Sequence, residues 1–287
     1  MVAIYKKEIK SYFTSITGYV FIAFVIVVVS IYSMAMNFAQ GVPNFEYSLA
    51  STNFIFTITI PILTMRVIAE ERKQKTDSLL YSLPLSMTEI VFGKYFAMLS
   101  VFAIPVVFML SFPAVLSLYG KVNFINTISS LVGYFLLGST LIAIGLLMSS
   151  LTENQVVAAA LCFGSMLLIF LMSTLAWYIP ASAQATTLSF SVIIVIAAIG
   201  VYFMTKNVVA ALVAAVLFEV PLVYVYLTNA PLLEGQFQSL MLSLSAFVRL
   251  STFINGIFDL TAVVYYLSLS GLFLFFTIQS MEKRRWS

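Results

Sequence analysis

The stretch that decides the fold is residues 128–178, which reads ISSLVGYFLLGSTLIAIGLLMSSLTENQVVAAALCFGSMLLIFLMSTLAWY. Two apolar segments, 128–150 and 156–178, flank a short polar turn that contains Glu153 and Asn154. A helix needs about 20 mostly apolar residues to cross a bilayer, and each segment meets this length. The stretch therefore predicts two membrane-spanning helices joined by a tight turn.

The composition of the whole chain extends this prediction. Of its 287 residues, 62% are hydrophobic and 9% are charged, whereas soluble domains hold about 45–50% apolar and about 25% charged residues. A soluble fold of this length cannot bury so much apolar surface, so its solvent must be lipid. We expect an all-α, polytopic membrane helical bundle.

Segments of membrane length, or nearly so, predict eight spans: 17–36, 53–69, 95–118, 128–150, 156–178, 188–205, 207–227 and 259–280. A single helix over 188–227 would be about 60 Å long at about 1.5 Å per residue, twice a bilayer core of about 30 Å, so two spans are expected there. Residues 228–258 are apolar but interrupted, which predicts an extracytoplasmic interfacial or re-entrant helix. We expect one transmembrane domain over 1–287.

The placement of basic residues predicts the orientation. If both termini are cytoplasmic, the basic residues on the cytoplasmic side are Lys6, Lys7, Lys10, Arg66, Arg72, Lys73, Lys75, Lys94, Lys206, Lys283, Arg284 and Arg285. Only Lys121 and Arg249 then fall outside, so 12 of the 14 basic residues follow the positive-inside rule. This placement accounts for the net charge of +3 without nucleic acid as a partner.

Several kinds of site are excluded by what the sequence lacks. The chain has no histidine and one cysteine, Cys162, so a metal site of imidazoles and thiolates and a His-based catalytic triad are not expected. Its two Gly-Lys pairs, at Lys94 and Lys121, are not followed by Ser or Thr, so no P-loop is present. We expect no catalytic residue, metal or cofactor on this chain.

Residues 1–15 have the pattern of a surface helix. Ile9, Tyr12, Phe13 and Ile16 recur at helical spacing, and the lysines lie largely on other faces. This pattern predicts an amphipathic helix on the cytoplasmic membrane surface. The alternative is a disordered basic leader.

The longest inward segment, 70–94, is also the most charged part of the chain. Asp77 is placed to cap a short helix that Pro84 ends. Ser86 precedes Glu89 by three residues, the spacing of a capping box, which predicts a second helix. The apolar side chains between them are Leu79, Leu80 and Leu83. Such a patch suggests a docking site for another protein; the alternative is a solvated connector between two spans.

Glu219 lies near the middle of the seventh expected span. A carboxylate at this depth costs roughly 2.5–3.5 kcal/mol, which makes it a candidate for binding a cation, carrying a proton or contacting a polar substrate. The alternative is a protonated side chain that is hydrogen-bonded within the bundle. Pro221 leaves the carbonyl of Leu217 without its helical donor, so that carbonyl is a candidate partner.

Three parts of the sequence resemble ABC-2 type transporter permeases. Glu70-Glu71, Leu79-Leu80, Ser82-Leu83-Pro84 and Gly93-Lys94 resemble the loop that forms the coupling helix of that family, and residues 149–155 resemble its shorter second cytoplasmic turn. The segments Phe253 to Asp259, Tyr265 to Ser268 and Glu282 to Trp286 resemble the gliding-motility-type branch. The resemblance covers essentially the whole chain, but the standard permease has six spans, so the pair at 188–227 is a departure.

The resemblance implies the permease subunit of an ATP-binding cassette exporter, a multi-pass protein of the bacterial cytoplasmic membrane. Two permease subunits, identical or related, would pair and bind two copies of a cytoplasmic ATPase, which would hold ATP and Mg²⁺. An accessory extracytoplasmic protein and membrane lipid are further candidate partners. The residues implied in ATPase coupling are Glu70, Glu71, Asp77, Leu79, Leu80, Leu83 and Pro84, with Glu153 and Asn154 as a second contact.

Two other functions compete with this interpretation. An ion-coupled secondary transporter would work through Glu219, but the sequence shows a single carboxylate at membrane depth and no internal repeat. An intramembrane enzyme would need a clustered catalytic set, which the sequence lacks. No motif identifies the substrate.

Overall fold

The computed structural model of the protein describes residues 1–76 and 85–285. By length and composition, these residues hold seven helices able to cross a membrane, or up to nine if each of two bent helix pairs forms one span. The predicted all-α architecture with about eight spans is confirmed. Contacts divide the chain into two compact units, residues 1–170 with 249–287, and residues 171–248.

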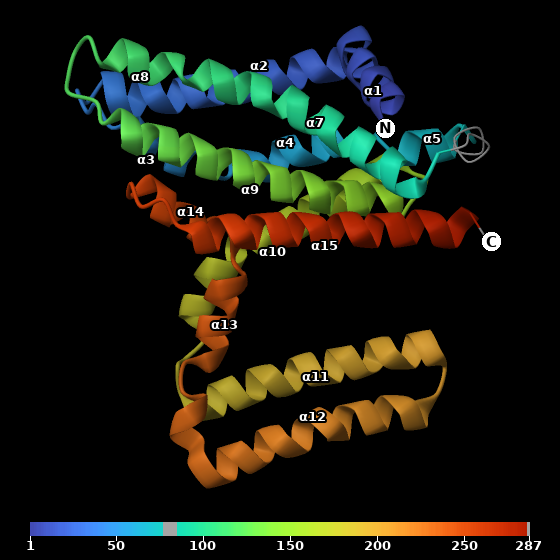
Figure 1. Ribbon diagram of the computed structural model, residues 1–287. Helices are drawn as coiled ribbons and strands as arrows, with labels where there is room; N and C mark the ends of the chain where they lie inside the picture. Colours follow the sequence, from blue (N-terminus) through green and yellow to red (C-terminus); the bar gives the residue numbers. More distant parts are fainter. Residues whose placement is uncertain (77–84, 286–287) are drawn as a thin grey trace. The chain divides into compact units, whose positions relative to one another are not determined.

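The first unit is a bundle around one central helix. Its elements are α1 (Val2–Thr14), α2 (Ile16–Ser33), η1 (Met34–Phe38), α3 (Phe45–Ser51), α4 (Ile55–Thr64), α5 (Ala69–Lys73), α7 (Met87–Met109), α8 (Ser111–Leu116), α9 (Phe124–Ser150), α15 (Leu260–Arg285), most of α10 (Gln155–Tyr178) and part of α14 (Ala246–Ile254). Helix α9 packs against α3, α4, α7 and α15 (Figure 1). It is the most buried of the candidate spans.

Glycines of α9 let its neighbours approach closely. The side chains that meet these glycines are Phe253 at Gly133, Phe102 at Gly138 and Thr64 at Gly145. A Cβ atom at Gly145 would lie 2.5 Å from Thr64 Oγ1, closer than Cβ contacts in proteins. Small residues of this kind allow close helix packing in membranes. Helix α9 therefore forms the core because three different elements fit against its glycines.

Helix α1 confirms the predicted N-terminal helix but buries a different stripe. Ile4, Glu8 and Tyr12, spaced four residues apart, are buried, and α1 packs along α7. Of the expected apolar stripe, Ile9 and Phe13 are half-buried, and Ile16 is exposed as the first residue of α2. The stripe against α7 thus includes a carboxylate, which needs a buried partner.

Helix α7 begins with the predicted capping box. The Ser86 side chain accepts from the Glu89 backbone N–H, and the Glu89 side chain accepts from the Ser86 backbone N–H. However, Ser86 does not cap a separate helix of the inward segment, because α7 continues without a break to Met109. The capping box therefore starts a membrane span, and Lys94 lies two turns inside that span.

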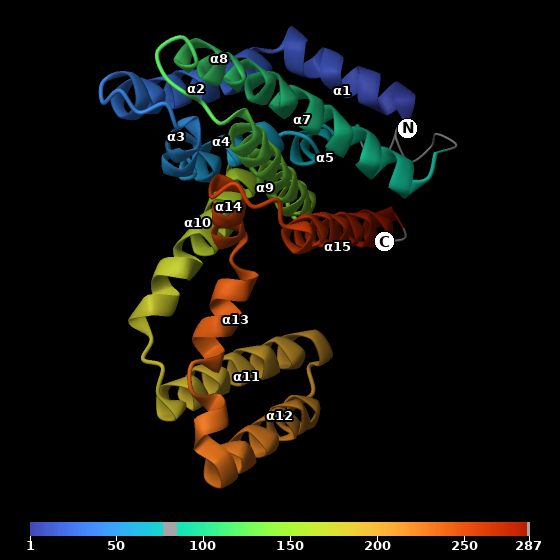
Figure 2. The same ribbon diagram turned by 60° about the vertical axis from the view of Figure 1, so that its left-hand side comes forward.

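The second unit centres on a helical hairpin. Helices α11 (Ala183–Thr205) and α12 (Val208–Asn229) run side by side (Figure 2). The turn between them is tight, with Lys206 in the left-handed region (φ 53°) and the Asn207 side chain capping α12. After η2 (Ala230–Leu233), helix α13 (Gln236–Leu244) leads toward α14. The expected pair of spans in 188–227 is confirmed as two helices of membrane length.

Candidate functional site

Most charged side chains of the first unit lie at one end of its bundle. This charged end comprises α1, α5, the start of α7, the turn from α9 to α10 and the C-terminal turns of α15 (Figure 1). Two of these elements, α5 and the turn from α9 to α10, hold residues that were expected to couple the chain to an ATPase: Glu70, Glu71, Glu153 and Asn154. All four make contacts within the chain.

Lys94 on α7 is the centre of a buried ionic cluster. Its side chain is 0% exposed, and its Nζ atom lies 2.8 Å from Glu8 Oε1 and 2.7 Å from Glu71 Oε2. Lys94 Nζ also donates a hydrogen bond to the Val67 carbonyl oxygen, 2.9 Å away. On the outer side, Lys7 Nζ lies 2.8 Å from Glu71 Oε1. We call Lys7, Glu8, Glu71 and Lys94 the Lys94 cluster.

The Lys94 cluster is electrically balanced, with two ammonium groups and two carboxylates. Burial of an ion costs several kcal/mol in proteins, and the cost is offset only when its charge is paired and its hydrogen bonds are made. Lys94 meets both conditions, because all three of its donors have an acceptor. The cluster therefore joins α1, α5 and α7 into one unit.

Tyr12 adds a hydrogen bond between α1 and the end of α4. Its hydroxyl donates to the Leu63 carbonyl at 2.7 Å. Burial, with a further contribution from the Glu8 carboxylate, raises the pKa of Tyr12 well above its ordinary value. The hydroxyl therefore keeps its proton, and this hydrogen bond, over the whole physiological pH range. Tyr12 and the Lys94 cluster therefore both hold α1 against the rest of the first unit.

Glu70 forms a second ion pair, so its carboxylate is not a free charge on the surface. Arg66 Nε donates to Glu70 Oε2 at 2.7 Å, and the same guanidinium donates to Thr17 Oγ1 at 2.6 Å. This network ties α5 to the first turn of α2. The two glutamates expected to couple the chain to an ATPase thus both have partners within the chain, Arg66 for Glu70 and the Lys94 cluster for Glu71.

The turn between α9 and α10 is joined to α5. Ser149 Oγ accepts from the backbone N–H groups of Ile68 at 3.2 Å and Ala69 at 3.1 Å. The buried Arg72 guanidinium donates to the Ser150 carbonyl. The two segments that were expected to contact an ATPase separately are therefore linked by hydrogen bonds.

Glu153 and Asn154 have different surroundings at this turn. Glu153 is exposed and pairs with Arg284 of α15. Asn154 Oδ1 accepts from the Val156 backbone N–H at 2.9 Å, which satisfies a donor at the start of α10. The remaining residues of the expected coupling set, Asp77, Leu79, Leu80, Leu83 and Pro84, lie outside the described residues.

The intramembrane residue Glu219 pairs with the neighbouring helix. Ser191 Oγ of α11 donates to Glu219 Oε1 at 2.5 Å. The partner is thus Ser191, and not the Leu217 carbonyl that Pro221 was expected to free. Within the described residues, the second oxygen of Glu219 is buried without a hydrogen bond. This geometry links α11 to α12 across the hairpin.

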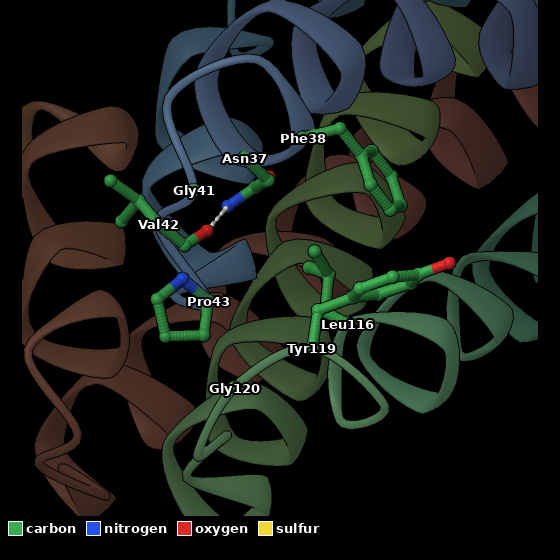
Figure 3. Close-up of a pocket in the computed structure, with 8 residues that line it drawn as sticks. All are labelled: Asn37, Phe38, Gly41, Val42, Pro43, Leu116, Tyr119 and Gly120. Atoms are coloured by element: carbon green, nitrogen blue, oxygen red, sulfur yellow. Dashed lines mark hydrogen bonds between the residues drawn. The ribbon is translucent and has the colours of Figure 1, made fainter.

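A pocket of about 250 Å³ lies at the other end of the first unit (Figure 3). Its walls are mainly apolar and include Phe38, Leu116 and Tyr119. Asn37 is its main polar side chain, but the Asn37 amide already donates to the carbonyls of Val42 at 2.9 Å and Asn44 at 3.0 Å. The pocket therefore offers apolar contact and few free hydrogen-bonding groups. Among the described residues, no group of three or more His, Cys, Asp or Glu side chains is arranged to hold a metal ion.

Sequence reasoning missed the Lys94 cluster. Lys94 had been assigned to the inward segment, and Glu8 had no assigned role. The signal that would have found them is the position of Glu8, four residues after Ile4 and four before Tyr12, on the stripe that α1 buries. A carboxylate at such a position requires a cation on the facing helix.

The comparison with known families agrees with this organisation. Residues 2–189 match a family described as ABC-2 family transporter protein, a region that contains the Lys94 cluster and the turn from α9 to α10. No match was found among the curated proteins. Members of this family are membrane permeases of ABC transporters, which normally work with a separate cytoplasmic ATPase. Because the match covers well over half of its residues, the chain belongs to the ABC-2 transporter family and is a multi-pass membrane permease.

Proposed function

We propose that this permease is the membrane subunit of an ATP-driven exporter and that its ATPase docks at the charged end. The observation that carries the proposal is the Lys94 cluster. Glu71 precedes the segment 77–84 and Lys94 follows it, and both carboxylates bound by Lys94 lie on other helices. An ATPase that pushes on 77–84 would thus act on a segment whose two flanks are ionically joined to each other and to α1.

A path from this segment to the core supports the proposal. Ser149 and Arg72 connect α5 with the end of α9. Helix α9 is the buried centre of the first unit, so movement of α5 would displace the helix against which α4, α7 and α15 pack. We infer that ATP-driven closure tilts these helices together.

The second ATPase contact is proposed at Glu153. This carboxylate is exposed and held by Arg284, so it is accessible from the same end as the flanks of 77–84. Asn154 acts by fixing the start of α10. The charged end would then be cytoplasmic, with both termini on that side, as the positive-inside rule indicates.

The full assembly that we propose contains two permease subunits and two ATPase subunits in a bacterial cytoplasmic membrane. The C-terminal resemblance favours the gliding-motility-type branch of the family. Substrate would leave between the permease subunits or laterally into the outer leaflet. ATP and Mg²⁺ would bind the ATPase, because the chain contains no P-loop.

Co-purification of the permease with the P-loop ATPase encoded next to it tests the proposal. We expect Leu80→Asp and Leu83→Asp to lower the recovered ATPase at least tenfold, because a charge in an apolar docking patch is desolvated without a partner. The matched control is Leu118→Asp, at a leucine that is 79% exposed near the other end of the first unit.

The two outcomes are distinct. Loss of the ATPase in the first two variants, with full recovery in the control, supports docking at the charged end. Unchanged recovery in Leu80→Asp and Leu83→Asp overturns it. Equal membrane levels of all variants, measured by an epitope tag, are required before the ratios are compared.

A further inference from the structure

Helix α1 has a basic edge that the Lys94 cluster does not use. Ile4, Glu8 and Tyr12 face α7. Lys6 and Lys10 are exposed, and at 100° per residue they project from the side opposite this buried stripe. Neither ammonium forms an ion pair within the part of the chain that the structure describes. Their charge is therefore available to something outside the chain.

The two flanks of this edge differ in polarity. On one flank, Val2 is exposed and Ile9 and Phe13 are half-buried, which leaves apolar surface beside the lysines. On the other flank, Lys7 turns toward Glu71 of the Lys94 cluster. Lys6 and Lys10 thus lie at the boundary between an apolar and a polar side of one helix. This is the position from which lysines extend from a membrane surface toward lipid headgroups.

The corner between α1 and α2 indicates the depth of this edge. The rings of Phe13 and Tyr19 meet edge to face, with centroids 5.6 Å apart. Tyr19 is 57% exposed and Ile16 is 77% exposed, and the first candidate span begins at Ile16. Aromatic rings of this kind gather at the membrane–water boundary. Lys6 and Lys10, one to three turns before this corner, would therefore lie at headgroup depth.

We propose that the edge formed by Lys6 and Lys10 binds the phosphate of anionic phospholipids. Charge complementarity favours an anionic headgroup over a zwitterionic one, because each lysine near an anionic surface contributes about a fivefold gain in binding. The apolar flank would contact the acyl chains of the same lipid. Anionic lipid would then hold α1 against the membrane from one side, while Glu8 and Tyr12 hold it against α7 from the other.

The alternative occupant of the edge is an acidic surface of the ATPase. The apolar flank argues against it, since an ATPase at the charged end would leave Val2 and Phe13 without apolar contact. The two occupants are separated by measuring lipid and ATPase on the same variants. The lipid measurement needs no ATPase, so its failure and the failure of the proposed exporter function are distinguishable.

Native mass spectrometry of the purified full-length permease provides the test. The protein is titrated with phosphatidylglycerol and, separately, with phosphatidylcholine of the same acyl chains. We expect tighter binding of phosphatidylglycerol to the wild type, at least fivefold weaker binding of the first phosphatidylglycerol to K6Q/K10Q, and retention of binding in K6R/K10R. Lys121→Gln, at an exposed lysine near the other end of the unit, should match the wild type.

Fold integrity is checked by the thermal transition of each variant, which K6Q/K10Q should leave unchanged because neither side chain makes an ion pair in the described chain. The proposal is overturned if K6Q/K10Q binds phosphatidylglycerol as tightly as the wild type. It is also overturned if the variant keeps its lipid but loses the ATPase, which would assign the edge to that protein.

Discussion

Lys94 Nζ lies 2.7 Å from Glu71 Oε2, and the lysine side chain is completely buried. The two residues flank the segment 77–84 in sequence, so this ion pair closes the base of the segment. Removing one partner of a buried pair leaves the other charge without compensation, which is more destabilising than removing both. The Lys94 cluster is therefore testable by comparing single and combined substitutions.

The first prediction concerns Lys94→Met. This variant removes the buried cation from Glu8 and Glu71 and leaves only the exposed Lys7 to offset the two carboxylates. We expect it to lose about 3–5 kcal/mol of stability. The measurement is unfolding of the purified permease in SDS, followed by circular dichroism. The combined variant Lys94→Met, Glu8→Gln, Glu71→Gln should recover a large part of the loss, because it buries no unpaired charge.

Lys73→Met is the matched control for this series. Lys73 is exposed at the end of α5, and surface substitutions change stability by about 0.5 kcal/mol or less. If Lys94→Met and Lys73→Met unfold alike, the Lys94 cluster does not stabilise the charged end. If the combined variant is as unstable as Lys94→Met alone, uncompensated charge is not the cause of the loss.

The second prediction tests α9 as the packed core. Gly138→Ala places a methyl group against the ring of Phe102 and should cost about 1–3 kcal/mol through overpacking. Gly164→Ala in α10 adds a methyl group that meets no heavy atom within 4 Å. It should be neutral or stabilise the helix by up to about 1 kcal/mol. SDS unfolding of the two variants decides: equal effects would show that α9 is not tightly packed at Gly138.

The third prediction separates ATP-driven transport from an ion-coupled mechanism. Glu219→Gln keeps an acceptor for Ser191, which donates to Glu219 at 2.5 Å, but it removes the titratable group. We expect ATP-dependent transport by inside-out vesicles to continue in this variant and to resist an uncoupler. Transport that stops in Glu219→Gln, and that collapses with an uncoupler while surviving ATP depletion, would instead identify Glu219 as the site of an ion-coupled carrier.

The fourth prediction concerns the ion pair of Glu153 and Arg284. Both side chains are substantially exposed, and surface ion pairs contribute about 0–1 kcal/mol, so Glu153→Gln should leave the unfolding transition almost unchanged. If Glu153 contacts the ATPase, the same variant should lower the permease-stimulated rate of ATP hydrolysis severalfold. A large loss of stability, or an unchanged rate of ATP hydrolysis, would show that Glu153 acts only within the chain or not at all.

The spans were predictable because they depend on local composition. A segment such as 128–150 can be identified as a span from its own residues, because an apolar helix of the right length is stable in lipid whatever the rest of the chain is. The Ser86–Glu89 capping box was predictable for the same reason, as both partners lie within one turn. What the pattern did not indicate is that this capping box starts the span itself.

The site residues were harder to assign because their partners are distant in sequence. Lys94 pairs with Glu8, 86 residues away, and Glu71 pairs with Lys7, 64 residues away; a single sequence does not encode such pairings locally. Glu219 was recognised as unusual at its depth, but its partner Ser191 lies on another helix. Local motifs therefore predicted where the charged end lies. Its ion pairs and hydrogen bonds could be identified only from the three-dimensional structure.

Site-directed cross-linking of the permease to the ATPase tests whether the ATPase docks at the charged end. In a Cys162→Ser background, a single cysteine is introduced as Thr152→Cys in the turn between α9 and α10, or as Asn123→Cys at the other end of α9. With a short bifunctional thiol reagent, we predict a cross-link to the ATPase from Thr152→Cys only. A cross-link from Asn123→Cys, or none from Thr152→Cys in a complex that hydrolyses ATP, would contradict the account.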